Sequence, residues 1–115
     1  MPTAKGDPGR PTERQFQRQV IALAKLFGWR VVHYRAVKAV NRRGQVRHLT
    51  PVMGDAGGPD LLLGKDGRVW LLELKTDTGR LSAAQRAWQA ALGDCYWVVR
   101  PADWNRLVDA LRGDG

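Results

Sequence analysis

The stretch that decides the fold is GGPDLLLGKDGRVWLLELK, residues 57–75. It contains two apolar runs, 61–63 and 68–75, separated by a Gly-Lys-Asp-Gly sequence at 64–67 that has the composition of a tight turn. Two apolar runs joined in this way predict an antiparallel β-hairpin. The second run is apolar at most positions, which favours a strand inside a sheet over one at its edge.

Helices are predicted on both sides of this hairpin by apolar residues at helical spacing. Thr12 with Gln15, and Ser82 with Gln85, have the spacing of capping boxes, which mark helix starts. We expect helices at 13–27, at 82–92 and from Pro101 onward, and further strands at 29–34 and 95–99. The segment 36–50 is predicted to be either a hairpin or a mobile loop. The order α-β-β-β-α-β-α predicts an α/β fold in which helices flank a mixed β-sheet.

The chain has 115 residues, which is room for one domain. Residues 1–11, rich in Pro and Gly, are predicted to be a flexible basic arm, and residues 12–115 the domain. Cys95 is the only cysteine, which excludes an internal disulfide or a Cys-rich zinc site and favours a reducing compartment. No apolar run approaches the roughly 18 to 20 residues of a membrane span. We therefore expect a soluble protein of the cytoplasm.

Positive charge is concentrated in the first half of the chain. Residues 1–50 hold 11 Lys and Arg against 2 acids, whereas residues 51–115 hold 8 against 9. One acid-free stretch contains Arg30, Arg35, Lys38, Arg42, Arg43 and Arg47. Such a stripe is typical of nucleic-acid binding, although a solvated loop has the same composition, and an anionic membrane is disfavoured because no basic amphipathic helix overlaps it. Gly57 and Gly58, having no side chains, would let a phosphate backbone approach.

The two glutamates of the chain, Glu13 and Glu73, are both placed where chemistry is expected. Glu73 and Lys75 are two residues apart on a strand, so they project from the same face. A turn at 64–67 would bring Asp60, at the start of the partner strand, beside them. Glu13 shares a helix face with Phe16, which predicts that it also faces inward.

Three carboxylates in one cleft would repel and raise each other's pKa, and Lys75 alone could not offset them. An all-oxygen cluster is the ligand set that Mg²⁺ or Mn²⁺ prefers, so the residues predict a metal site that hydrolyses phosphodiesters. Each residue also has a purely structural explanation: an exposed Glu73–Lys75 ion pair, a helix-dipole role for Glu13, turn chemistry for Asp60, and capping alone for Gln85.

Taken in order, these elements resemble a known family. Gly58-Pro59-Asp60, twelve residues, then Glu73-Leu74-Lys75 is similar to the PD-(D/E)XK signature of restriction-endonuclease-like nucleases. Thr12-Glu13, Gly28-Trp29 and Gln85 extend the resemblance to the virus-type replication-repair nuclease (VRR-NUC) branch. The resemblance covers about residues 12 to 100.

The resemblance implies a restriction-endonuclease-like core and a specific set of roles. Asp60, Glu73 and the Leu74 carbonyl would bind Mg²⁺ or Mn²⁺, Glu13 would complete the metal site directly or through water, and Lys75 and Gln85 would serve the nucleophile and the phosphate. It further implies a structure-specific DNA endonuclease that cuts four-way (Holliday) junctions as a homodimer, in the cytoplasm of a bacterium or a phage-infected cell. The alternative from another class is a basic DNA-binding accessory protein that keeps the fold without catalysis.

Overall fold

The computed structural model describes residues 9–33, 37–40, 42–49 and 54–113, and for 37–40 and 46–49 it describes the backbone only. Most of the predicted arm at 1–11, and Arg35, lie outside the described residues. In chain order, the helices and strands are α1 (Glu13–Leu26), β1 (Arg30–His33), β2 (Val37–Val40), β3 (Val46–Leu49), β4 (Leu61–Lys65), β5 (Arg68–Leu74), α2 (Ala83–Leu92), β6 (Tyr96–Val99) and α3 (Trp104–Arg112). Short 3₁₀ turns at Gly93–Cys95 and Pro101–Asp103 precede β6 and α3.

Strands β4 and β5 form the predicted hairpin. Lys65 pairs with Arg68, so the turn is the two residues Asp66 and Gly67, shorter than the expected 64–67. Both turn residues have positive φ, 50° and 79°, which is the requirement of a type I′ turn and the reason that Asp-Gly suits this place. Gly64 instead continues the strand.

The main sheet has the order β1-β4-β5-β6. The β1–β4 and β4–β5 pairs are antiparallel, whereas β5 and β6 are parallel and are joined through α2. The sheet is therefore mixed and flanked by helices, as predicted, and β5 has a neighbour on each side. This interior position explains its nearly continuous apolar sequence.

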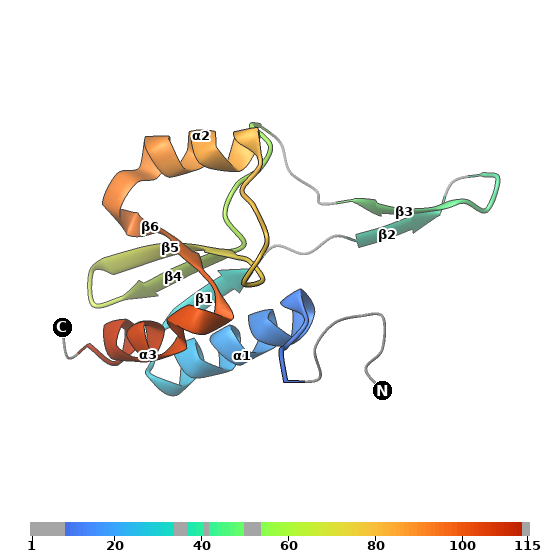
Figure 1. Cartoon of the computed structure of the whole chain (residues 1–115). Helices are drawn as coiled ribbons and strands as arrows, with labels where there is room; N and C mark the ends of the chain where they lie inside the picture. The colour runs from blue at the N-terminus through green and yellow to red at the C-terminus, as the bar shows by residue number, and fades with distance from the viewer. Residues whose placement is uncertain (1–8, 34–36, 41, 50–53, 114–115) are drawn as a thin grey trace.

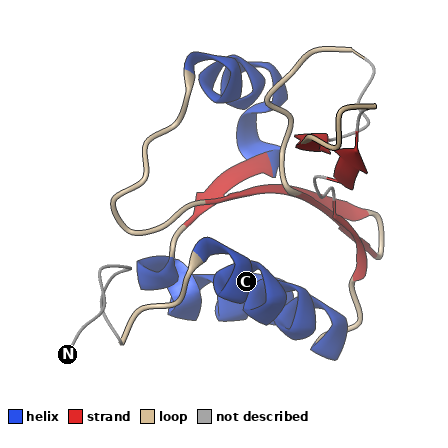
Figure 2. Ribbon diagram, turned by 90° about the vertical axis from the view of Figure 1, so that its right-hand side faces the viewer, coloured by secondary structure: helices blue, strands red, loops and turns tan. Residues whose placement is uncertain are grey.

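Helices cover the sheet unequally (Figures 1 and 2). Helix α2 lies over one face, and α1 and α3 lie together on the other. The second of these layers contains the core, to which α1 contributes Phe16, Val20 and Ala24, and α3 contributes Leu107 and Leu111. Full burial of each large side chain contributes roughly 1.5 to 3 kcal/mol to folding.

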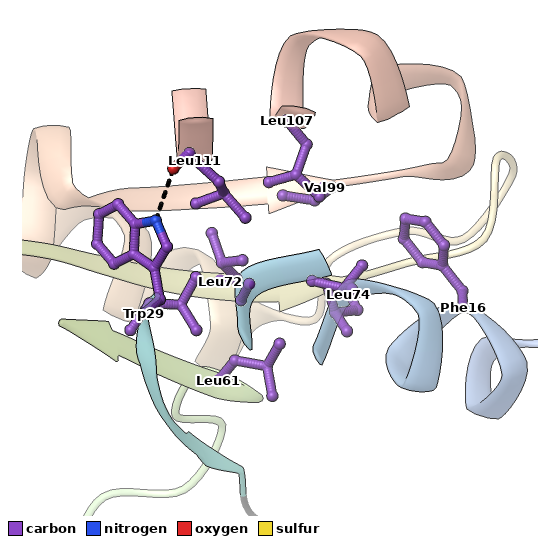
Figure 3. Packing of buried hydrophobic residues seen from close by; sticks show 11 residues of the cluster. Phe16, Trp29, Leu61, Leu72, Leu74, Val99, Leu107 and Leu111 are labelled. Carbon is purple, nitrogen blue, oxygen red and sulfur yellow. Dashed lines mark hydrogen bonds between the residues drawn. The ribbon is translucent and has the colours of Figure 1, made fainter. Parts of the chain in front are cut away.

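Trp29 joins the start of β1 to the end of α3 (Figure 3). Its side chain is only 3% exposed, and its Nε1 donates a hydrogen bond of 2.7 Å to the Leu111 carbonyl. At the other end of the core layer, the predicted capping box is present, since Gln15 N–H donates to Thr12 Oγ1 at 3.1 Å and Thr12 N–H donates to Gln15 Oε1 at 2.9 Å. The Trp29 contact therefore joins β1 to α3, and the capping box fixes the start of α1.

The basic segment 36–50 contains a hairpin, which is one of the two predicted alternatives. Strands β2 and β3 pair antiparallel, with Lys38 opposite His48 and Ala39 opposite Arg47, in a two-stranded sheet of their own. Figure 1 shows this hairpin extending away from the main sheet and its helices. None of the described helices is long and apolar enough to cross a membrane.

Candidate functional site

Asp60 and Glu73 meet at one end of the β4–β5 hairpin, as the sequence predicted. Asp60 directly precedes β4, and its Oδ2 accepts a hydrogen bond of 2.8 Å from the Leu74 N–H. Its own N–H donates to the Leu72 carbonyl at 2.9 Å. The Asp60 carboxylate is therefore held against the last residues of β5, next to Glu73.

Glu73 is a buried acid, only 2% exposed. Leu72 and Leu74 on either side of it belong to the core beneath the sheet, so Glu73 points to the opposite face, toward α2. There its Oε2 accepts a hydrogen bond of 3.1 Å from Gln85 Nε2. Its Oε1 is also buried but has no hydrogen-bond partner.

Gln85 forms the predicted capping box and also a hydrogen bond to Glu73 that the sequence analysis did not predict. Its Oε1 accepts from the Ser82 N–H at 2.8 Å, which completes the capping box of α2, while its Nε2 reaches Glu73. The helix cap thereby fixes the side chain that orients the acid. Gln85 is a positioning residue for Glu73 in this structure.

Burial is the main reason that the pKa of Glu73 rises from its ordinary value of 4.5 to about 8. The negative charge of the neighbouring Asp60 adds to the rise, Lys75 opposes it, and Glu13 raises it slightly further. With a pKa of about 8, the Glu73 carboxyl holds its proton near neutral pH.

Lys75 is placed by the strand β6 and the chain that follows it. Its N–H donates to the Val99 carbonyl at 3.0 Å. Arg100, the next residue after Val99, donates through one guanidinium nitrogen to the carbonyls of Thr76 at 2.6 Å and Gly79 at 2.7 Å. The loop after Lys75 is therefore clamped to the end of β6, an arrangement that the sequence analysis did not predict.

Glu13 does not face inward, and this prediction is wrong. It is exposed, at the first position of α1. It shares a helix face with Phe16, but it lies almost a full turn before Phe16, the first buried residue of the helix. Glu13 nevertheless lies close enough to the site for its charge to act on Glu73.

Among the residues that the structure describes, no three His, Cys, Asp or Glu side chains form a group able to hold a metal ion. Of the three predicted carboxylates, Asp60 and Glu73 lie together, whereas Glu13 is exposed. This pair still offers the oxygen ligands that hard divalent ions prefer, and the buried Glu73 Oε1 is an acceptor without a donor. These two acids fit Mg²⁺ or Mn²⁺ if the Leu74 carbonyl and water supply further oxygens.

Tyr96 is a site residue that the sequence analysis missed. Tyr96 pairs with Leu71 and Val98 pairs with Glu73 in the parallel β5–β6 register, so Tyr96 lies on the same sheet face as Glu73. Its hydroxyl is buried and has no hydrogen-bond partner. Burial, and then the charges of Glu73 and Asp60, raise the pKa of the Tyr96 hydroxyl to about 12. A polar hydroxyl within an otherwise apolar strand was the available signal.

The loop before Asp60 is packed against the start of α2. Trp88 Nε1 donates to the Ala56 carbonyl at 2.9 Å. Gly57 has φ +83°, and a Cβ added there would lie 2.7 Å from the Ala84 Cβ. The absence of a side chain at Gly57 is therefore explained by contact with the helix, and its role in phosphate approach stays a prediction. Gly58 is exposed and remains available for such a role.

We expect Gly57→Ala to destabilise the protein more than Gly67→Ala. Both glycines have positive φ, so each substitution strains the backbone. At Gly67 a Cβ would meet nothing within 4 Å, whereas at Gly57 it would overlap Ala84. The overlap should cost roughly 1 to 3 kcal/mol more, measured by urea unfolding. Equal losses in the two variants would contradict the contact.

None of the predicted basic DNA-binding residues that the structure describes lies on β4 or β5, the strands that position the carboxylates. Arg30 is exposed on β1, Arg42 and Arg43 are exposed in the β2–β3 turn, and Lys38 and Arg47 lie within the strands of that hairpin. They occupy the hairpin and the edge strand β1, whereas the acids lie at the end of β4 and β5.

Comparisons of the chain with family models, curated proteins and solved structures find no match.

Proposed function

We propose that the protein is a Mg²⁺- or Mn²⁺-dependent DNA endonuclease. The observation that carries this proposal is the meeting of Asp60 and Glu73 at one end of the β4–β5 hairpin, where Glu73 has a buried oxygen without a partner and Lys75 follows two residues later. A buried carboxyl whose pKa is strongly raised beside a second acid destabilises the folded protein, and a functional role explains why it is present.

Asp60, Glu73 and the Leu74 carbonyl would hold the divalent ion, and Glu13, exposed nearby, would contribute through water. The bound ion would supply Lewis acidity and neutralise the negative charge that develops on the phosphate. Lys75 would orient the attacking water and add positive charge beside the phosphate. Gln85 would keep Glu73 in place through the hydrogen bond to Oε2.

We also propose that the α/β architecture is a restriction-endonuclease-like core of the VRR-NUC branch. The mixed sheet, with an acid before β4 and a Glu-Leu-Lys sequence at the end of β5, supports this proposal. The same resemblance leads us to propose a cytoplasmic homodimer acting on branched DNA, because paired cuts across a four-way junction need two sites related by a two-fold axis.

Cleavage assays test the proposal directly. Purified protein is incubated with supercoiled plasmid, linear duplex and a synthetic four-way junction in Mg²⁺, in Mn²⁺ and in EDTA. We expect metal-dependent cutting, fastest on the junction, and a dimer mass in sedimentation at concentrations that cut. Tight, salt-sensitive DNA binding without any cutting would instead favour the non-catalytic accessory protein.

Metal binding by itself gives a second test. Mn²⁺ at about 100 times its dissociation constant should stabilise the folded protein by about 2.7 kcal/mol, seen as a higher melting temperature. Asp60→Asn should abolish this shift, because it removes the negative charge that would bind the metal. The hydrogen bond from the Leu74 N–H should remain, because the amide keeps an oxygen that accepts it. Asp66→Asn, at the opposite end of the same hairpin, is the control and should keep the shift. An unchanged shift in Asp60→Asn would remove Asp60 from the metal site.

A further inference from the structure

The β2–β3 hairpin has the charge of a polyanion-binding element. Residues 37–49 include Lys38, Arg42, Arg43 and Arg47 and no Asp or Glu. Arg42 and Arg43 are exposed in the turn between the strands. The cross-strand pairs place Lys38 beside His48 on one face of the ribbon and Arg47 beside Ala39 on the other. Basic residues therefore lie at register positions on both faces of the ribbon and in its turn.

Among the described residues, the hairpin pairs with no strand of the main sheet. Its two strands form their own sheet, and among the described residues their substantial contacts are with each other. In Figure 1 the hairpin extends away from the body. A single two-stranded hairpin is at best marginally stable in water, so this one gains most from a partner that binds it.

We propose that the β2–β3 hairpin binds duplex DNA by entering its major groove. A two-stranded β-ribbon is one of the two protein elements that the major groove admits. The ribbon would enter with its turn, and its Lys and Arg residues would contact the phosphates that border the groove. The inference deepens the proposed function, since it names the part of the DNA that is bound and separates it from the part that is cut.

The experiment measures binding to DNA in EDTA, where metal-dependent cutting does not occur. Fluorescence anisotropy gives the affinity of the full chain for a labelled duplex and for a single strand of the same length, across a series of salt concentrations. Arg42→Ala/Arg47→Ala is compared with Lys25→Ala/Arg112→Ala, which removes the same charge from the last turns of α1 and α3. Binding is therefore scored whether or not the protein is a nuclease.

The ribbon variant should bind duplex about tenfold more weakly at ~0.1 M salt, with a salt slope reduced by roughly two, because each substitution removes one cation that neutralises a phosphate. The affinity of the control variant for duplex should change little. The affinity of the ribbon variant for the single strand should also change little. A duplex whose cytosines carry bulky groups in the major groove should bind the unmodified protein as weakly as plain duplex binds the ribbon variant. Thermal unfolding should be the same for both variants.

Three results would each overturn the inference. One is an equal reduction of affinity in the ribbon and control variants, since net charge alone would then explain binding. The second is undiminished binding to the groove-blocked duplex. The third is a ribbon variant with a changed mass in sedimentation and unchanged affinity for DNA, which would make the hairpin an interface between copies of the chain.

Discussion

Glu73→Gln is expected to slow metal-dependent DNA cleavage by roughly a thousandfold or more, equivalent to about 4 kcal/mol of lost transition-state stabilisation. Glutamine has nearly the size of glutamate and can still accept the hydrogen bond from Gln85 Nε2. The substitution therefore removes the carboxylate that would bind the metal and leaves the packing. Lys75→Met removes the ammonium while keeping an unbranched side chain, and we expect a loss of about a hundredfold to a thousandfold.

The measurement is the rate of nicking of supercoiled plasmid in Mg²⁺ and Mn²⁺ by each variant at equal concentration. Asp66→Asn is the matched control, because it makes the same kind of change at the β4–β5 turn, where Asn tolerates the positive φ of 50°. It should cut at the rate of the unmodified protein. Full activity in Glu73→Gln or in Lys75→Met would show that the proposed site is not the one that cuts DNA.

The metal-free protein is expected to lose stability as the pH rises from about 4.5 to about 8, and Glu73→Gln should remove most of this loss. The pKa of Glu73 is raised to about 8 in the folded protein, against 4.5 in the unfolded chain. Between these values the folded state binds more protons than the unfolded state, so the free energy of unfolding falls as protons are removed. The total effect is on the order of 3 to 5 kcal/mol, and it is complete above pH 8.

Urea unfolding in EDTA, at intervals from roughly pH 4 to pH 9, measures this profile. Glu73→Gln has no carboxyl to ionise, so its stability should change less with pH and should exceed that of the unmodified protein at the alkaline end. Asp66→Asn removes an exposed acid and should keep the original slope. Parallel profiles for the unmodified protein and Glu73→Gln would contradict a raised pKa at Glu73.

Much of the fold could be predicted because its signals are local in the sequence. The β4–β5 hairpin follows from two apolar runs around Asp66-Gly67, and the starts of α1 and α2 follow from capping boxes within four residues. The meeting of Asp60 with Glu73 is predictable for the same reason, since the register of a hairpin is set by its turn. Local signals could not decide whether the segment 36–50 forms a hairpin or a loop, because an isolated two-stranded hairpin is only marginally stable in water.

The site residues that were missed all depend on contacts between distant segments. The place of Tyr96 beside Glu73 requires the parallel register of β5 and β6, and the clamp on the loop after Lys75 requires the same pairing to bring Arg100 near. The need for glycine at position 57 arises from the approach of a loop to α2. Helical spacing placed Glu13 on the correct side of α1, but the distance to the first buried turn left it in solvent.

The sequence by itself determined which residues could form a site, because strand alternation and a tight turn bring Asp60, Glu73 and Lys75 to one end of a hairpin through short-range geometry. Only the tertiary structure decided the protonation of Glu73. Helix α2 lies over Glu73 and strand β6 lies beside it, and the removal of water from this carboxyl raises its pKa to about 8. Desolvation depends on everything packed around a group, and no pattern along the chain records it.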